Sequence, residues 1–139
     1  MRPQADIPTI AMSLHPGLAP GLHHRVGAAL APLRDEGVLI LGSGNSYHNM
    51  QGFAAGSGAG PSAAFDGWLA GAVAKTVDAR EHALGSWSGA PAAREAHPRE
   101  EHLIPLMIAA GAAGDEPGRR VFADTIMGAT ISAFQFGGP

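Results

Sequence analysis

The chain has 139 residues, of which 45% are hydrophobic, and this length accommodates one globular domain. Its formal net charge is −3 and its one lysine is Lys75, so it lacks the basic clusters expected of a nucleic-acid-binding protein. Cysteine is absent, which excludes disulfides, thiolate metal ligands and a cysteine nucleophile. Its longest apolar run, at residues 104–114, is too short to span a bilayer, and the N-terminus does not resemble a signal peptide. We therefore expect one cytoplasmic domain that binds neither nucleic acid nor membrane.

A strand, a helix and a second strand are predicted in the first third of the chain. Residues 7–13 are apolar and partly β-branched, which is typical of a strand. Apolar residues recur at helical spacing over residues 23–36, although Pro32 should kink or end the helix. Residues 38–41 form a second apolar β-type run. This order predicts a βαβ unit with parallel strands and a right-handed crossover.

The rest of the chain alternates between helical and strand patterns. Residues 51–61 hold four glycines, which indicates a flexible loop. Helices are predicted over residues 65–73, 78–87 and 103–113. Residues 121–127 and 130–136 are rich in Val, Ile, Thr and Phe and predict two strands joined by a tight turn. The predicted fold is α/β, with a mixed β-sheet flanked by helices.

The first candidate functional residue is His48, in the run GSGNSYHN at residues 42–49. Because the run follows the predicted strand at residues 38–41, it should lie where α/β sheets bind their ligands. Its small residues Gly42, Ser43 and Gly44 would let the backbone approach a ligand closely. The run is neither a dinucleotide fingerprint nor a P-loop, and the chain has no serine nucleophile elbow. A loop histidine held by backbone groups remains the alternative.

The second candidate is His102, which lies at or near the start of the helix predicted over residues 103–113. Glu100 and Glu101 precede it and suit the positive end of a helix dipole. The two histidines could serve a metal site and an acid/base step. An exposed helix-start residue is the alternative for His102, and a simple turn is the alternative for His97.

These runs, together with residues 30–40, closely resemble the class III extradiol ring-cleavage dioxygenases, in the DOPA 4,5-dioxygenase-like branch of the LigB superfamily. The similarity extends over residues 7–137. One motif is a strand ending in G-S-G-x-x-x-H-N. The other is a P-x-x-E-H-x-x-P-L helix start, matched here by Pro98, Glu101, His102, Pro105 and Leu106. The resemblance implies opening of catechol-type rings by O2 at a divalent non-haem metal, Fe(II) or Zn(II).

Carried over by position, the resemblance implies that His102 is a metal ligand and that His48 is an acid/base residue. It also implies that His23, Ser43, Gly44 and Asn49 line the substrate pocket, where His23 matches a recurring histidine at the start of the first helix. Neutral imidazole binds both metals. A histidine with an unperturbed pKa of about 6.5 can take a phenolic proton and return it later.

The resemblance covers the C-terminal half of this family. Its members carry two further histidine ligands in an N-terminal half, in H-G-S-P-like and S-A-H-W-like motifs, and residues 1–14 match neither. We therefore expect residues 1–139 to form a partial catalytic domain that is inactive alone and pairs with a complementing N-terminal half or with itself. A non-catalytic subunit of a complete enzyme and a small ligand-binding module with incidental histidines are the alternatives.

Overall fold

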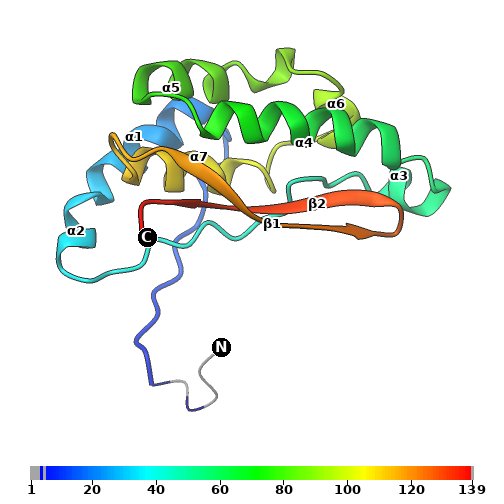
Figure 1. The fold of residues 1–139 in the computed structure, drawn as a ribbon. Coiled ribbons are helices and arrows are strands. Elements are labelled where there is room, and N and C mark those ends of the chain that lie inside the picture. The colour runs from blue at the N-terminus through cyan, green and yellow to red at the C-terminus, as the bar shows by residue number, and fades with distance from the viewer. Residues whose placement is uncertain (1–3, 5, 139) are drawn as a thin grey trace.

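The computed structural model of the protein describes residue 4 and residues 6–138, and it places a layer of helices on one side of a β-hairpin (Figure 1). The α/β class is therefore confirmed. The helices are α1 (Pro20–Leu30), α2 (Pro32–Asp35), α3 (Met50–Ala55), α4 (Ala59–Val73), α5 (Val77–Gly85), the 3-10 helix η1 (Trp87–Gly89), α6 (Ala93–Ala96) and α7 (Ile104–Ala112). The strands are β1 (Gly118–Ile126) and β2 (Ala129–Phe136).

The hairpin of β1 and β2 confirms the two strands predicted near the C-terminus. The strands pair antiparallel from Gly118 opposite Phe136 to Ile126 opposite Ala129. Met127 and Gly128 connect them, with φ angles of 50° and 81°. Positive φ at both loop residues is the geometry of a tight two-residue hairpin turn, which follows the twist of the strands. The inner face of β2 packs against α4.

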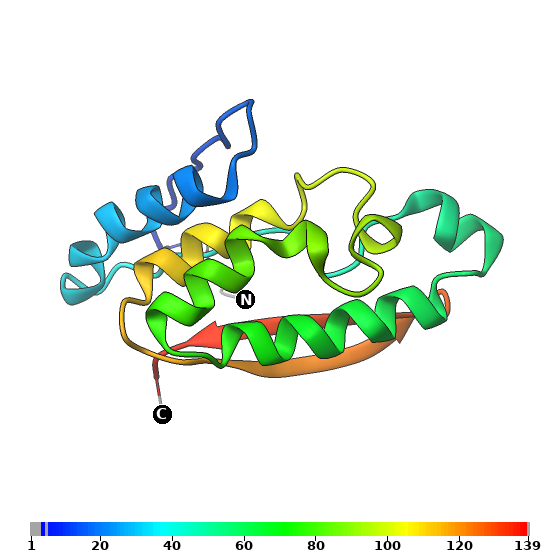
Figure 2. The same ribbon diagram turned by 90° about the horizontal axis from the view of Figure 1, so that it is seen from above.

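Helices α1 and α7 pack closely against each other, and α5 lies between them and α4 (Figure 2). A Cβ atom built on Gly27 would lie 2.0 Å from the carbonyl oxygen of Ile108, and one built on Gly111 would lie 2.0 Å from that of His24. Only glycine permits two helix backbones to approach this far. α1 ends at Leu30, before Pro32, as its sequence predicts.

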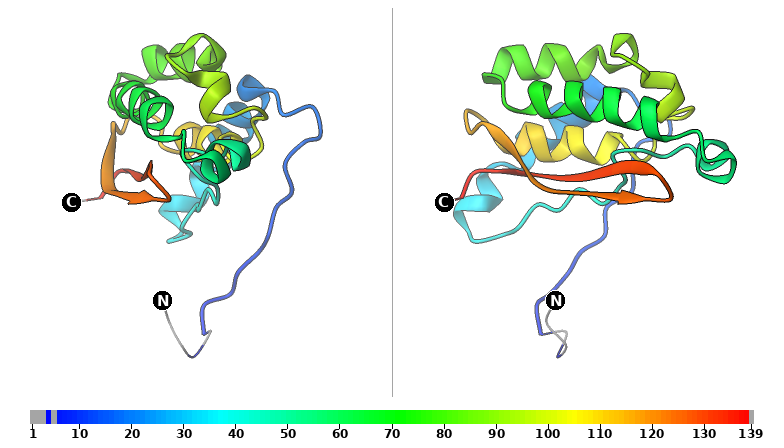
Figure 3. Two further views of the ribbon diagram at one scale, coloured as in Figure 1. Left: turned by 90° about the vertical axis from the view of Figure 1, so that its right-hand side faces the viewer. Right: turned by 45° about the vertical axis from the view of Figure 1, so that its right-hand side comes forward.

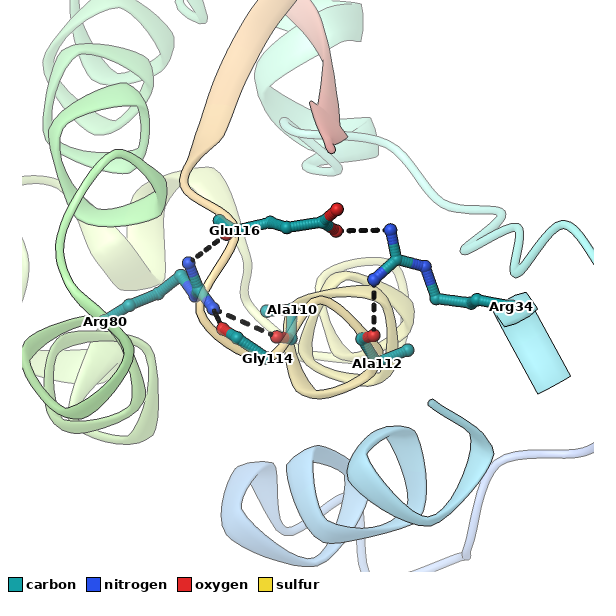
Figure 4. Close-up of polar contacts among 6 residues, drawn as sticks. All are labelled: Arg34, Arg80, Ala110, Ala112, Gly114 and Glu116. Atoms are coloured by element: carbon teal, nitrogen blue, oxygen red, sulfur yellow. Dashed lines mark hydrogen bonds and ion pairs between the residues drawn. The ribbon is translucent and has the colours of Figure 1, made fainter. Parts of the chain in front are cut away.

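The C-terminal end of α7 is held by two arginines (Figure 4). Fully buried Arg80 donates hydrogen bonds to the carbonyls of Ala110 at 3.4 Å, Gly114 and Glu116 at 2.7 Å. Arg34 donates to the carbonyl of Ala112 at 2.9 Å and pairs with the Glu116 carboxylate. Because the last carbonyls of a helix have no partner within the helix, these guanidinium groups satisfy groups that burial would otherwise leave unpaired.

The predicted parallel strands at residues 7–13 and 38–41 do not form. Both segments are extended, but among the described residues the sheet contains only β1 and β2, so it is antiparallel and not mixed. Residues 7–13 run away from the helices (Figure 3). Leu39 and Leu41 are 82% and 80% exposed. An apolar β-type run sets a preference for extended backbone, whereas a strand also needs a neighbour for its N–H and C=O groups.

The predicted flexible loop at residues 51–61 is also wrong, because this stretch forms α3 and the first turn of α4. Its small residues are used for close packing. Cβ atoms built on Gly52 and Gly58 would lie 2.2 and 3.0 Å from the hydroxyl oxygen of buried Tyr47. Gly52 and Gly58 therefore make room for an aromatic ring. No helix in the described part of the chain is long and apolar enough to cross a membrane.

Candidate active site

The imidazoles of His48 and His102 lie stacked on each other. Their ring centroids are 3.6 Å apart and their planes differ by 18°. His48 lies just before α3, and His102 lies in the turn that leads into α7. Both side chains are half-buried. The structure thus brings together the two histidines that the sequence singles out.

Glu101 is the third member of this cluster. Its Oε1 atom lies 3.8 Å from Nδ1 of His48, and one donor atom from each of His48, Glu101 and His102 lies within 4.8 Å of the others. Sequence reasoning assigned Glu101 and Glu100 alike to the helix dipole. The structure shows that the two carboxylates have different contacts. Glu100 accepts a hydrogen bond from Arg94 at 2.8 Å, which lowers the pKa of the Glu100 carboxyl. Two signals in the sequence pointed to Glu101: it is adjacent to a predicted ligand, and it occupies the glutamate position of the P-x-x-E-H-x-x-P-L motif.

The segment that carries His48 is clipped to the end of α6 by three hydrogen bonds. The His48 main-chain N–H donates to the carbonyl of Ala96 at 2.9 Å. Nδ2 of Asn49 donates to the carbonyl of Glu95 at 2.8 Å. Nε2 of His97 donates to the carbonyl of Ser46 at 3.0 Å. We call residues 46–49 and 95–97 the clip.

His97 is a structural part of the site that sequence reasoning missed. It is completely buried against the rings of Phe65 and Trp87, at centroid distances of 5.2 and 6.1 Å. Burial lowers the pKa of His97 to about 4, against the opposing effect of its hydrogen bond to Ser46. His97 is therefore neutral at pH 7. Because it must donate from Nε2, its buried Nδ1 carries no hydrogen, and this atom has no hydrogen-bond partner among the described residues.

The electrostatics of the site favour a neutral His102. Burial and the neighbouring His48 lower the pKa of the His102 imidazole, while Glu101 acts in the opposite direction. Nδ1 of His102 is buried and makes no hydrogen bond to any residue that the structure describes. A neutral imidazole with a ring nitrogen free of hydrogen bonds is the form in which histidine binds a metal ion.

The glycines before His48 bring the backbone close to α7. A Cβ atom on Gly44 would lie 2.1 Å from the carbonyl oxygen of His102, and one on Gly42 would lie 2.6 Å from that of Pro105. The expected close approach therefore exists, and in this structure the approaching partner is the first turn of α7. Gly42 and Gly44 fix the distance between the two histidine-bearing segments.

The structure places the other predicted pocket residues as follows. Asn49 caps α3, because its Oδ1 accepts from the Gly52 N–H at 2.9 Å, and its Nδ2 is used in the clip. Ser43 is exposed next to Gly44. His23 is buried at the start of α1, and its ring nitrogens contact the carbonyl of Ala19 at 2.8 Å and the N–H of His15 at 3.1 Å. The structure thus shows backbone contacts for Asn49 and His23, and their substrate roles stay predictions.

An apolar groove of about 490 Å³ lies beside His102. It is lined by the extended residues 38–46, by α7 and by β2. The side chains of Leu103, Leu106 and Phe134 are among its lining residues. One wall of this groove is therefore an extended segment that has no strand partner in the described part of the chain.

Comparison with known proteins assigns the class. A family model described as the catalytic LigB subunit of aromatic ring-opening dioxygenase matches residues 1–135. The chain belongs to this family of enzymes, which confirms the resemblance drawn from its two histidine motifs.

Its relatives include two plant proteins named 4,5-DOPA dioxygenase extradiol. The chain is 44% identical over 117 residues to that of Beta vulgaris and 41% identical over 123 residues to that of Portulaca grandiflora, covering 83% and 84% of this chain and 43% of each relative. It is 36% identical over 151 residues to the dioxygenase tasH of Hapsidospora irregularis, covering 99% of this chain and 46% of the relative. The chain thus spans less than half the length of these relatives.

Proposed function

We propose that this chain is one half of an extradiol dioxygenase site that opens catechol-type aromatic rings with O2. In this site His102 binds the metal and His48 acts as the acid/base residue. The observation that carries the proposal is the convergence of the two imidazoles at 3.6 Å from segments far apart in the sequence. Membership of the LigB family and the names of the relatives support the reaction class.

The donor atoms fit a divalent transition metal. Nδ1 of His102 and Oε2 of Glu101 are buried and have no hydrogen-bond partner among the described residues, although Oε2 lies 3.6 Å from Nε of Arg99. Burial without a hydrogen bond costs free energy, which a bound ion would offset. Imidazole nitrogen and carboxylate oxygen are ligands of both Fe(II) and Zn(II). When bound, such an ion would polarise the catechol hydroxyls and hold the substrates beside each other.

The surroundings of His48 suit proton transfer. Its Nδ1 faces the carboxylate of Glu101 at 3.8 Å, which leaves Nε2 to accept a proton from a catechol hydroxyl. The clip fixes the backbone on either side of this imidazole. His48 therefore holds its position without a rotation of the main chain, and the Glu101 carboxylate can stabilise the imidazolium that forms.

A complementing N-terminal half would complete the site. The resemblance supplies two further histidine ligands from such a half, and the relatives are more than twice as long as the segment they share with this chain. Exposed Leu39 and Leu41 lie on an extended segment beside the apolar groove that has no strand partner among the described residues, and this surface is suited to strand addition. We propose that the complementing half, rather than a second copy of this chain, covers this surface.

Oxygen uptake tests the proposal. The chain alone, supplied with Fe(II) and a catechol, should consume no O2, and co-expression with a polypeptide carrying the H-G-S-P-like and S-A-H-W-like motifs should give turnover. In the complex, His48→Ala should lower turnover by roughly 10²-fold or more. His82→Ala is the matched control, because His82 is exposed on α5.

Three outcomes would decide against this function. Wild-type turnover in the His48→Ala complex would refute the acid/base role. An assembled complex that binds catechol without consuming O2 would favour the ligand-binding alternative. A stable dimer of this chain that does not bind the complementing half would refute the proposed partner.

A further inference from the structure

We propose that Arg94 is a positioning residue of the candidate active site. It fastens the turn that carries His102 to α6, the helix that also holds the segment of His48. The inference rests on the proposed roles of these two histidines. Arg94 lies on the four-residue helix α6, outside both histidine motifs.

The guanidinium of Arg94 has three contacts. Its Nη1 donates hydrogen bonds to the Glu100 carboxylate at 2.8 Å and to the main-chain carbonyl of Pro98 at 3.4 Å. Its Cζ atom lies 4.6 Å from the ring centre of buried Trp87. A guanidinium that lies over an aromatic ring and also donates hydrogen bonds is fixed in direction as well as in position. Arg94 therefore holds the turn at two points from a fixed base.

Glu100 links this contact to the position of His102. The main-chain N–H groups of Leu103 and Ile104 donate to the carbonyl of Glu100 at 2.8 and 2.9 Å. These two hydrogen bonds close the turn that contains His102 and lead directly into α7. By holding the side chain of Glu100, Arg94 therefore holds the residue on which the His102 turn closes.

The segment of His48 is attached to the same helix. The carbonyl of Ala96 accepts from the His48 N–H at 2.9 Å, and the carbonyl of Glu95 accepts from Asn49 at 2.8 Å. Helix α6 thus contacts one histidine segment through its main chain and the other through Arg94. The two imidazoles, with ring centroids 3.6 Å apart, are therefore positioned relative to each other through one helical turn.

The exposure of the ion pair separates positioning from global stability. The side chains of Arg94 and Glu100 are 52% and 26% exposed. A pair with this much exposure contributes little to the free energy of unfolding. Its effect should instead appear in the geometry of the site, where a displacement of roughly 1 Å can cost about 10²-fold in rate.

Proton NMR of the chain alone, at pH 8.5, tests the inference without turnover. Each stacked imidazole shifts the ring-proton resonances of the other, so these resonances report the separation of the two rings. In Arg94→Met the resonances of His48 and His102 should move at least halfway to their values in the urea-unfolded chain, while the urea midpoint stays close to wild type. Glu100→Gln should move them in the same direction, and the double variant should add little to either change. Arg25→Met, at an exposed position on α1, is the matched control and should leave them unmoved.

Turnover of the assembled complex gives a second readout. Arg94→Met should lower kcat roughly tenfold and change KM for a catechol much less, because the distance for proton transfer changes. Arg94→Lys keeps the positive charge and loses the planar fork, so its kcat should lie between those of wild type and Arg94→Met.

The outcomes separate this inference from the proposed function. Unmoved ring-proton resonances in Arg94→Met would overturn the positioning role, and a lower urea midpoint with unmoved resonances would show that Arg94 acts on stability alone. An equal shift in Arg25→Met would also overturn it. Absence of turnover in the wild-type complex would refute the proposed function, while the resonances of the chain alone would still decide the role of Arg94.

Discussion

His97 donates a hydrogen bond from Nε2 to the main-chain carbonyl of Ser46 at 3.0 Å, two residues before His48. This buried imidazole therefore acts on the backbone of the candidate catalytic histidine from the opposite segment of the chain. Ser46 is held from a second side, because its hydroxyl accepts from the Ser132 N–H of β2 at 2.8 Å. The position of His48 thus depends on contacts with both α6 and the hairpin.

The burial of His97 predicts a loss of stability in acid. Its pKa is about 4 in the folded chain and about 6.5 when unfolded. Above pH 6.5 the His97 imidazole is neutral in both the folded and the unfolded chain, so the free energy of unfolding is not reduced by its protonation. As the pH falls from 6.5 to 4, His97 is protonated in the unfolded chain but not in the folded one. The free energy of unfolding therefore drops by roughly 3 kcal/mol. Urea unfolding at pH 7.5, 6.0 and 4.5 measures this fall in the free energy of unfolding with pH.

The His97→Asn variant isolates this effect from other titrating groups. The variant should be less stable at pH 7.5, because it leaves a cavity between two aromatic rings. Its stability should nevertheless fall less between pH 6.5 and 4.5 than that of the wild type. Equal slopes in the two proteins would show that His97 is not the group responsible.

Gly44 should not tolerate a side chain. In Gly44→Ala the new Cβ would lie 2.1 Å from the His102 carbonyl oxygen, so the first turn of α7 must move. We expect a loss of about 1–3 kcal/mol in unfolding free energy and weaker metal binding. Gly60→Ala is the control, because nothing lies within 4 Å of its Cβ position and alanine favours the helix. Equal stability of the two variants would refute the close approach.

Arg80 should be essential for the C-terminal end of α7. Arg80→Met keeps an apolar stem of similar length and removes the donors to three carbonyl groups. Leaving buried acceptors unpaired should cost about 2–4 kcal/mol in urea unfolding. Arg25→Met, on the exposed side of α1, should change stability by less than about 0.5 kcal/mol. A small effect of Arg80→Met would mean that water replaces the guanidinium.

Leu39 and Leu41 should matter for assembly and not for the chain itself. Because both side chains are at least 80% exposed, the double change to Glu should leave the urea midpoint unchanged. The same change should prevent co-purification with the complementing half, since it places two charges on the proposed docking surface. Met50→Glu, at a 64% exposed position on α3, is the control. An intact complex with the double variant would place the interface elsewhere.

Local patterns predicted the longer helices and the hairpin, because the information lies within a few residues, but they did not predict the short helices α3 and α6. Periodicity predicted α4 and α7, and Pro32 predicted the end of α1. The two runs rich in Val, Ile, Thr and Phe on either side of Gly128 predicted the hairpin. The parallel strands failed for the opposite reason, because a strand depends on a neighbour that its own sequence does not describe. The glycines at residues 51–61 suggested a flexible loop. In the structure, Gly52 and Gly58 instead leave space for the side chain of Tyr47.

The site was predicted in part. Family motifs singled out His48 and His102, and the structure shows that they meet. The motif that carries His102 also contains Glu101 and not Glu100, but it assigned Glu101 no contact. His97 lies in a turn without regular spacing, so no periodicity could separate it from an ordinary turn residue. Burial and hydrogen-bond partners, which only the fold supplies, gave both residues their contacts.

The clip also makes the site cooperative. His48 lies within one segment of the clip, residues 46–49, and His102 lies a few residues after the other segment. A fluctuation that breaks the clip therefore loosens the positions of both imidazoles at once. Partial opening therefore yields a chain with neither histidine in place, rather than one that retains half of the cluster. A metal ion bound at the histidines would then suppress this opening. Occupancy of the metal site would therefore be coupled to the rigidity of both segments of the clip.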